Sequence, residues 1–148
     1  ISPIHAAMLV SAIANGGTLM KPYVIDSVQS TEGSVIEQYE SENYGTLMSA
    51  SESSQLTKMM KAVVEEGTGY KLSGKNYSVA GKTGTAEVVG RGNNAWFVGF
   101  APADDPEVLA IAIIHNPQGV YYGGQVAAPV VRQLFENVLP YLDKMDYN

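Results

Sequence analysis

Cysteine is absent from the sequence, which excludes disulfide bonds and thiolate metal sites and leaves the redox compartment open. Basic residues are few: 9 Lys and Arg stand against 15 Asp and Glu, for a formal net charge of −6. Binding to phosphate backbones needs a cationic surface, so nucleic acid is not expected as a partner. No apolar stretch approaches the ~20 residues that would span a bilayer.

The length of 148 residues fits one ordinary domain or a large piece of a bigger one. Hydrophobic residues make up 45% of the chain, which is typical of a globular protein and not of a disordered one. The chain opens with Ile1-Ser2-Pro3 and enters a helical pattern without an initiator Met. We therefore expect residues 1–148 to be part of a longer protein, with residues missing upstream.

Local patterns in the first third of the chain predict a helix, a hairpin and a loop. The helix runs from about residue 4 to 15 and is apolar almost all round, so it should be buried on more than one side. Strand-forming residues at 23–29 and 34–39 predict a peripheral hairpin. The polar segment from Glu40 to Ser54 is interpreted as a loop.

The remaining two thirds predict two helices around three strands. A helix after residue 54 has apolar residues at i, i+3, i+4, i+7 and i+8: Leu56, Met59, Met60, Val63 and Val64. Met59 and Met60 are expected to fill the core. Three strand-like runs, separated by turn residues, follow at 78–89, 95–101 and 108–115. A last helix is predicted from Val126 to Asp143. Consecutive antiparallel strands flanked by helices indicate an α+β layered fold.

The segment most informative about function is Ala80-Gly81-Lys82-Thr83-Gly84-Thr85-Ala86-Glu87, in the first of these strands. A glycine in a strand lets a ligand or another backbone approach closely. Alternation places Lys82 and Gly84 on one face, and Thr83 and Thr85 on the other. The edge of such a strand can pair with a peptide, while the lysine and the hydroxyls can donate hydrogen bonds to a carboxylate.

Other residues and one other motif have different interpretations. A phosphate-binding loop would need a glycine five positions before Gly81, where Asn76 stands, so it is excluded. His5 and His115 lie far apart, which favours packing or capping roles over a shared metal site. Trp96 is expected in the core, and neither a metal nor a cofactor is expected.

The motif strand resembles the Lys-Thr-Gly strand of penicillin-binding proteins and serine β-lactamases. Further segments resemble class B penicillin-binding proteins in the same order along the chain: 12–22, 63–69, 96–103 and 121–129. This resemblance runs through nearly the whole sequence. It implies that residues 1–148 are the C-terminal portion of a single transpeptidase domain, with an antiparallel sheet flanked by helices.

The resemblance also implies a chemistry. In this family a serine of a Ser-x-x-Lys motif attacks the D-Ala-D-Ala end of a peptidoglycan stem peptide, and β-lactams acylate the same serine. By resemblance, Lys82 sets a positive field for the substrate carboxylate, the hydroxyls of Thr83 and Thr85 lie nearby, and Gly84 keeps the strand open. The backbone N–H of Thr85 is implied as one of two oxyanion donors. The implied location is the outer face of the bacterial cytoplasmic membrane.

The nucleophile of the family is missing, because no serine in the sequence has a lysine three residues later. Thr18 and Thr68 have that spacing but sit beside glycine turns, and Ser41-Glu42-Asn43 fits Ser-x-Asn only formally. We therefore expect the nucleophile to precede Ile1 and the chain alone to be inactive. The apolar strand at 108–114 should pair with the missing N-terminal part of the domain or with another copy of this chain.

The leading interpretation is thus part of a D,D-transpeptidase whose ligands are stem peptides and β-lactams. Two alternatives stay open. One is a non-catalytic interaction domain that kept the fold, and the other is a fragment of a β-lactamase or β-lactam sensor, which shares the Lys-Thr-Gly motif.

Overall fold

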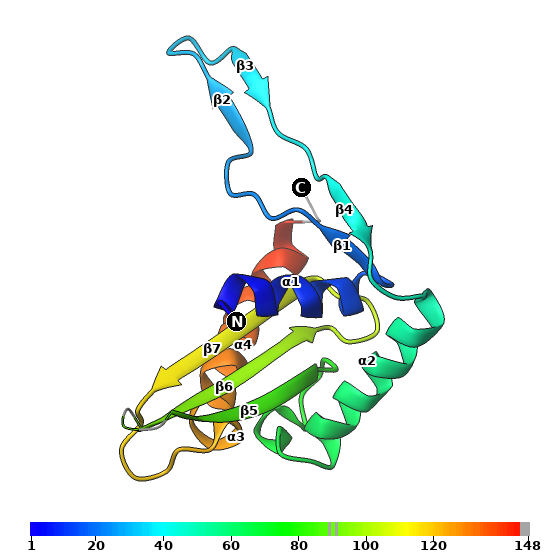
Figure 1. The fold of residues 1–148 in the computed structure, drawn as a ribbon. Coiled ribbons are helices and arrows are strands. Elements are labelled where there is room, and N and C mark those ends of the chain that lie inside the picture. The colour runs from blue at the N-terminus through cyan, green and yellow to red at the C-terminus, as the bar shows by residue number, and fades with distance from the viewer. Residues whose placement is uncertain (89, 91, 146–148) are drawn as a thin grey trace.

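A computed structural model describes residues 1–88, 90 and 92–145 (Figure 1). Its centre is an antiparallel sheet in the order β5-β6-β7, with β5 at Ala80–Val88, β6 at Gly92–Ala101 and β7 at Val108–His115. The helices are α1 (Pro3–Ala14), α2 (Ala50–Glu65), α3 (Gly123–Val126) and α4 (Ala128–Met145), with a 3₁₀ turn, η1, at Tyr70–Leu72. The predicted α+β class and antiparallel sheet are confirmed, although Val89 of the expected first strand lies outside the described residues.

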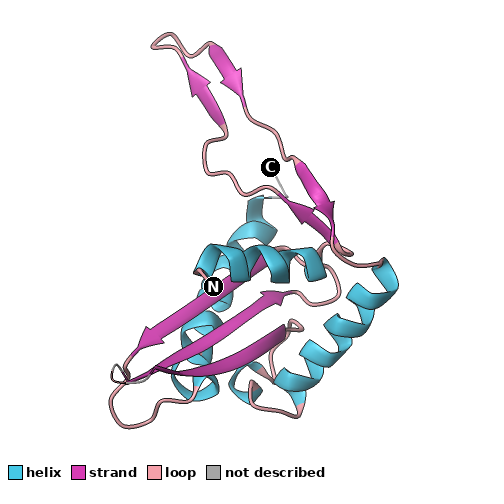
Figure 2. Cartoon of the chain, in the orientation of Figure 1, coloured by secondary structure: helices cyan, strands magenta, loops and turns pink. Residues whose placement is uncertain are grey.

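Helices cover both faces of this sheet (Figure 2). Side chains alternate between the faces along a strand, so Phe97 and Phe100 of β6 point in opposite directions. Phe97 packs in one core cluster with Val131 and Phe135 of α4. Phe100 packs in a second cluster with Met60 of α2 and residues of α1. The two clusters hold the sheet between α1 and α4.

The predicted hairpin is present as β2 (Ser27–Gln29) and β3 (Val35–Gln38), which pair antiparallel. It projects from the body as an arm (Figure 1). At its base, β1 (Thr18–Met20) pairs with β4 (Asn43–Thr46), and Lys21 forms an ion pair of 2.8 Å with Glu42.

The prediction of a loop from Glu40 to Ser54 is wrong, because this segment contains β4 and the first turn of α2. A capping box begins this helix: the Ser49 hydroxyl accepts a hydrogen bond from the Glu52 N–H, and the Glu52 carboxylate accepts one from the Ser49 N–H at 2.8 Å. This Ser-x-x-Glu signal is present in the sequence, and the interpretation of the polar segment as a loop missed it. Ser53 is buried, and its hydroxyl donates to the Ile13 carbonyl at 2.6 Å.

Two expectations about helix burial are also wrong. On α1, Ala12 is buried but Ile4 and Leu9 are 52% and 46% exposed, because the described sheet packs against one side of this helix only. On α2, the buried residues include Met60 and Val64, whereas Met59 is 61% exposed. The helix predicted from Val126 to Asp143 is confirmed as α4, preceded by the separate turn α3. None of the described helices is long and apolar enough to cross a bilayer.

Asp104, in the turn between β6 and β7, connects three parts of the fold. Its carboxylate accepts hydrogen bonds from the Lys61 ammonium and the Ser78 hydroxyl, each at 2.9 Å. The Ser78 hydroxyl accepts in turn from the Ala103 N–H at 3.0 Å. The hydrogen bond from Lys61, followed by that from Ser78, lowers the pKa of the Asp104 carboxyl.

We predict that Asp104→Asn destabilises the protein at neutral pH. A carboxyl with a lowered folded-state pKa stabilises the fold fully above its unfolded pKa, about 3.9, and this contribution disappears as the pH falls through the folded pKa. Urea unfolding from pH 7 to pH 2 should show the gap between wild type and variant closing at low pH. Asp105→Asn, at the exposed neighbouring position, is the matched control. A gap that does not change with pH would contradict the prediction.

Candidate functional site

The motif strand β5 lies at one edge of the described sheet. It pairs with β6 without a break, including Lys82 opposite Val98, Thr83 opposite Phe97 and Thr85 opposite Ala95. Among the described residues, no strand pairs with its other edge. A side chain at Gly81 would lie 2.4 Å from the Phe97 ring, so this position needs glycine for β5 to sit flat on the core.

Both motif threonines point to the α3 side of the strand. The hydroxyls of Thr83 and Thr68 are 2.6 Å apart, and the Gly123 N–H donates to the Thr85 hydroxyl at 3.4 Å. This is the alternation expected from the sequence, with Thr83 and Thr85 sharing one face. Thr68 lies in the family-like segment 63–69, but the sequence did not connect it with the motif strand, because no spacing pattern links residues fifteen positions apart.

Lys82 is exposed, and its ammonium donates to the Thr83 carbonyl at 2.7 Å. Within the described part of the chain, no carboxylate forms an ion pair with it. Since alternate residues direct their backbone groups to the same side of a strand, we infer that the Thr85 N–H lies on the same side of β5 as the Thr83 carbonyl that Lys82 contacts.

Two glycines let α3 lie directly against the motif strand. A side chain at Gly123 would lie 2.1 Å from the Trp96 carbonyl oxygen and 2.5 Å from that of Gly84. A side chain at Gly124 would lie 2.0 Å from the Thr68 carbonyl oxygen. Any larger residue would push α3 away from the strand, so these contacts set the width of the space beside the threonines.

A hollow lies on each side of the motif strand. The one on the α3 side has a volume of about 420 Å³ and is lined by Thr68, Tyr70, Lys82, Thr83, Gly84, Thr85, Tyr122, Gly123, Gly124 and Gln125. The one on the α1 side, of about 460 Å³, is lined by the motif residues together with Trp96 and Val98. Trp96, which was expected in the core, is only partly buried and lines this second hollow together with Ile1 and with Ala6 of α1.

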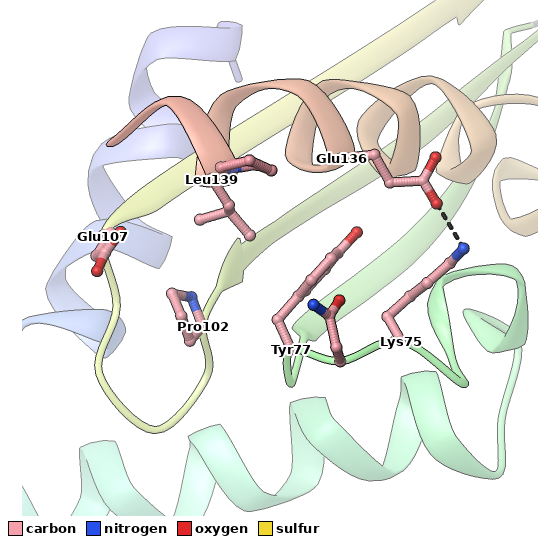
Figure 3. A pocket seen from close by; sticks show the side chains of 8 residues that line it. Lys75, Tyr77, Pro102, Glu107, Glu136 and Leu139 are labelled. Carbon is pink, nitrogen blue, oxygen red and sulfur yellow. Dashed lines mark ion pairs between the residues drawn. The ribbon is translucent and has the colours of Figure 1, made fainter. Parts of the chain in front are cut away.

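A further pocket of about 330 Å³ lies beyond the end of β6, against the C-terminal half of α4 (Figure 3). The Lys75 ammonium and the Glu136 carboxylate form an ion pair of 2.6 Å at its side, which lowers the pKa of Glu136. Burial raises the pKa of Tyr77, whose hydroxyl has no hydrogen-bond partner among the described residues. The pocket contains none of the motif residues, and its lysine is already paired.

The remaining candidates do not join the motif strand. His5 contacts the Ser2 hydroxyl at 2.9 Å in a capping role, and His115 contacts Asn94 at 2.9 Å. The described residues hold no cluster of three or more potential metal ligands. Asn43 of the formal Ser-x-Asn match lies in β4 at the base of the arm, where its side chain accepts from the Gly45 N–H at 2.8 Å.

Comparison with known proteins identifies the family. The penicillin-binding protein transpeptidase domain matches residues 1–136. The chain belongs to this transpeptidase family. Stage V sporulation protein D of Bacillus subtilis is 37% identical over 150 residues, covering 96% of the chain and 23% of that protein. Peptidoglycan D,D-transpeptidase PbpA of Mycolicibacterium smegmatis is 33% identical, covering 89% of the chain and 28% of that protein.

Solved structures of transpeptidases share the fold. The imipenem acyl-enzyme complex of penicillin-binding protein A from M. tuberculosis superimposes with a TM-score of 0.84 at 28% identity, covering 94% of the chain and 31% of that structure. The D,D-transpeptidase domain of a peptidoglycan glycosyltransferase from Eggerthella lenta has a TM-score of 0.77 at 35% identity, covering 88% and 31%. The chain therefore spans about a third or less of these relatives' own lengths.

We predict that Gly123→Ala destabilises the transpeptidase fold, because its methyl group would collide with two backbone carbonyls. Overpacking of this kind costs on the order of 1–3 kcal/mol. Gly84→Ala is the matched control, since its methyl group would meet Trp96 at an ordinary contact distance of 3.4 Å. Thermal unfolding should show a larger fall in Tm for Gly123→Ala. Equal Tm values for the two variants would contradict the close packing of α3 on β5.

Proposed function

We propose that residues 1–148 are the C-terminal portion of a peptidoglycan D,D-transpeptidase domain and form the Lys-Thr-Gly wall of its site. The nucleophilic serine and its lysine come from residues outside the chain, because no Ser-x-x-Lys occurs in the sequence. The observation that carries the proposal is the open edge of β5, where the exposed Lys82 ammonium stands beside two oriented threonine hydroxyls. Such an edge suits an extended peptide that ends in a carboxylate.

Each motif residue has a separate role in this proposal. The Lys82 ammonium attracts the terminal carboxylate of the D-Ala-D-Ala peptide, and the hydroxyls of Thr83 and Thr85 donate hydrogen bonds to it. The backbone N–H of Thr85 stabilises the oxyanion that forms when the serine attacks the carbonyl, a contribution of about 3–4 kcal/mol where such donors were removed. Gly84 carries no side chain that would block the ligand.

β-Lactams bind the same wall, since their carboxylate and carbonyl groups can make the same contacts as the peptide. The M. tuberculosis relative forms acyl-enzyme complexes with imipenem and penicillin G, which supports this assignment. The proposed location is the outer face of the bacterial cytoplasmic membrane, where peptidoglycan is cross-linked.

We predict that residues 1–148 alone keep their intact mass after incubation with excess benzylpenicillin, whereas the full-length gene product gains the mass of one penicillin. Without the nucleophile no acyl-enzyme can form. In the full-length protein, Lys82→Ala should slow acylation by about 10- to 100-fold, the range for a lost hydrogen bond to a charged group.

Lys58→Ala, at an exposed position on α2, is the control for this substitution and should acylate like the wild type. A penicillin adduct on residues 1–148 alone would show that a hydroxyl of this chain is reactive and would contradict the proposal. So would a full-length protein that penicillin does not modify.

The outer edge of β7 is the proposed contact for the rest of the domain. Among the described residues β7 pairs only with β6, and it is almost entirely apolar. An unpaired apolar edge favours pairing with another strand. Residues 1–148 alone should therefore sediment as a dimer or larger species in analytical ultracentrifugation. A monomer at every concentration would contradict this contact.

A further inference from the structure

We propose that Thr68 is a positioning residue for carboxylate binding, acting through the hydroxyl of Thr83. This inference rests on the proposed function, which makes Thr83 a donor to the ligand carboxylate. The two hydroxyl oxygens are 2.6 Å apart, a short hydrogen bond, although the residues come from different elements. Both side chains line the hollow on the α3 side of the motif strand, together with Lys82.

The number of protons fixes the direction of this hydrogen bond once a ligand is bound. A threonine hydroxyl has one proton to donate and two lone pairs to accept with. A carboxylate is only an acceptor, so Thr83 must use its single proton on the ligand. The bond to Thr68 can then persist only if Thr68 donates and Thr83 accepts. Such a chain of hydrogen bonds polarises the central hydroxyl and strengthens its bond to the carboxylate.

Backbone contacts on both sides of Thr68 hold the segment that carries it. The next residue, Gly69, is buried and donates its N–H to the Val63 carbonyl at 2.8 Å, which anchors the segment to the end of α2. On the other side, the Thr68 carbonyl oxygen lies so close to Gly124 that a methyl group there would sit 2.0 Å away. The backbone of the segment is therefore packed between α2 and α3, which places the exposed Thr68 side chain where its hydroxyl meets that of Thr83.

Loss of the Thr68 hydroxyl should affect the non-covalent binding of penicillin and not the acylation step. Because Thr68 orients a group that holds the carboxylate, its loss should raise the dissociation constant of the first, non-covalent penicillin complex. The rate constant of the acylation step should stay nearly unchanged. The expected increase in dissociation constant is about three- to tenfold, the range for one lost hydrogen bond.

The test is penicillin acylation of the full-length gene product, measured over a range of benzylpenicillin concentrations so that the two constants are resolved. Thr68→Val should show the increase, and Thr68→Ser, which keeps the hydroxyl, should restore the wild-type value. Thr46→Val, at an exposed position in β4, is the matched control and should change neither constant. In a Thr83→Val background, Thr68→Val should have no further effect, because the two residues act as one unit.

The inference is overturned if Thr68→Val binds penicillin as the wild type does, or if Thr68→Ser is as defective as Thr68→Val. It is also overturned if the effects of Thr68→Val and Thr83→Val on the dissociation constant add up in the double variant. Thr68→Ala, which also lacks the hydroxyl, gives the same comparison if Thr68→Val does not fold. A wild-type protein that penicillin fails to acylate would instead overturn the proposed function, and this inference with it.

Discussion

Antiparallel pairing between β5 and β6 determines where every motif side chain of this chain lies. The ladder runs without a shift from Ala80 opposite Phe100 to Val88 opposite Gly92, so moving β5 by one residue would turn Gly81, Thr83 and Thr85 together to the opposite face of the sheet. The Phe97 ring fills the space that Gly81 leaves, which couples this register to the packing of α4. The motif is thus positioned by the core and not by a flexible loop.

The site depends equally on segments that contain no motif. Residues after α2 supply Thr68, and α3 brings its two glycines against the strand, so that Thr83 and Thr85 each have a partner on the same face. These partners orient the hydroxyls without any contribution from outside the chain. The Lys82 ammonium, in contrast, is satisfied by a single backbone carbonyl and has donors left for a ligand.

Sequence patterns predicted the elements that have strong local signals. The three central strands, the hairpin arm and α4 follow from alternation, turn residues and helical spacing, and Lys82 to Thr85 followed from the motif itself. What could not be predicted depends on tertiary contacts. The exposure of Met59 and Trp96 reflects which faces other elements cover, and the Thr68 to Thr83 bond joins segments with no shared pattern. The missed start of α2 is different, because its capping box was in the sequence.

A crystal structure of the full-length gene product acylated by penicillin would test the central claim most directly. The account predicts that the penicillin carboxylate lies within hydrogen-bond distance of the Thr83 and Thr85 hydroxyls and near the Lys82 ammonium. It also predicts that the carbonyl oxygen of the acyl group contacts the Thr85 N–H, and that the ester bond joins a serine outside residues 1–148. An acyl group attached to a hydroxyl within residues 1–148, or one that leaves the edge of β5 free, would contradict it.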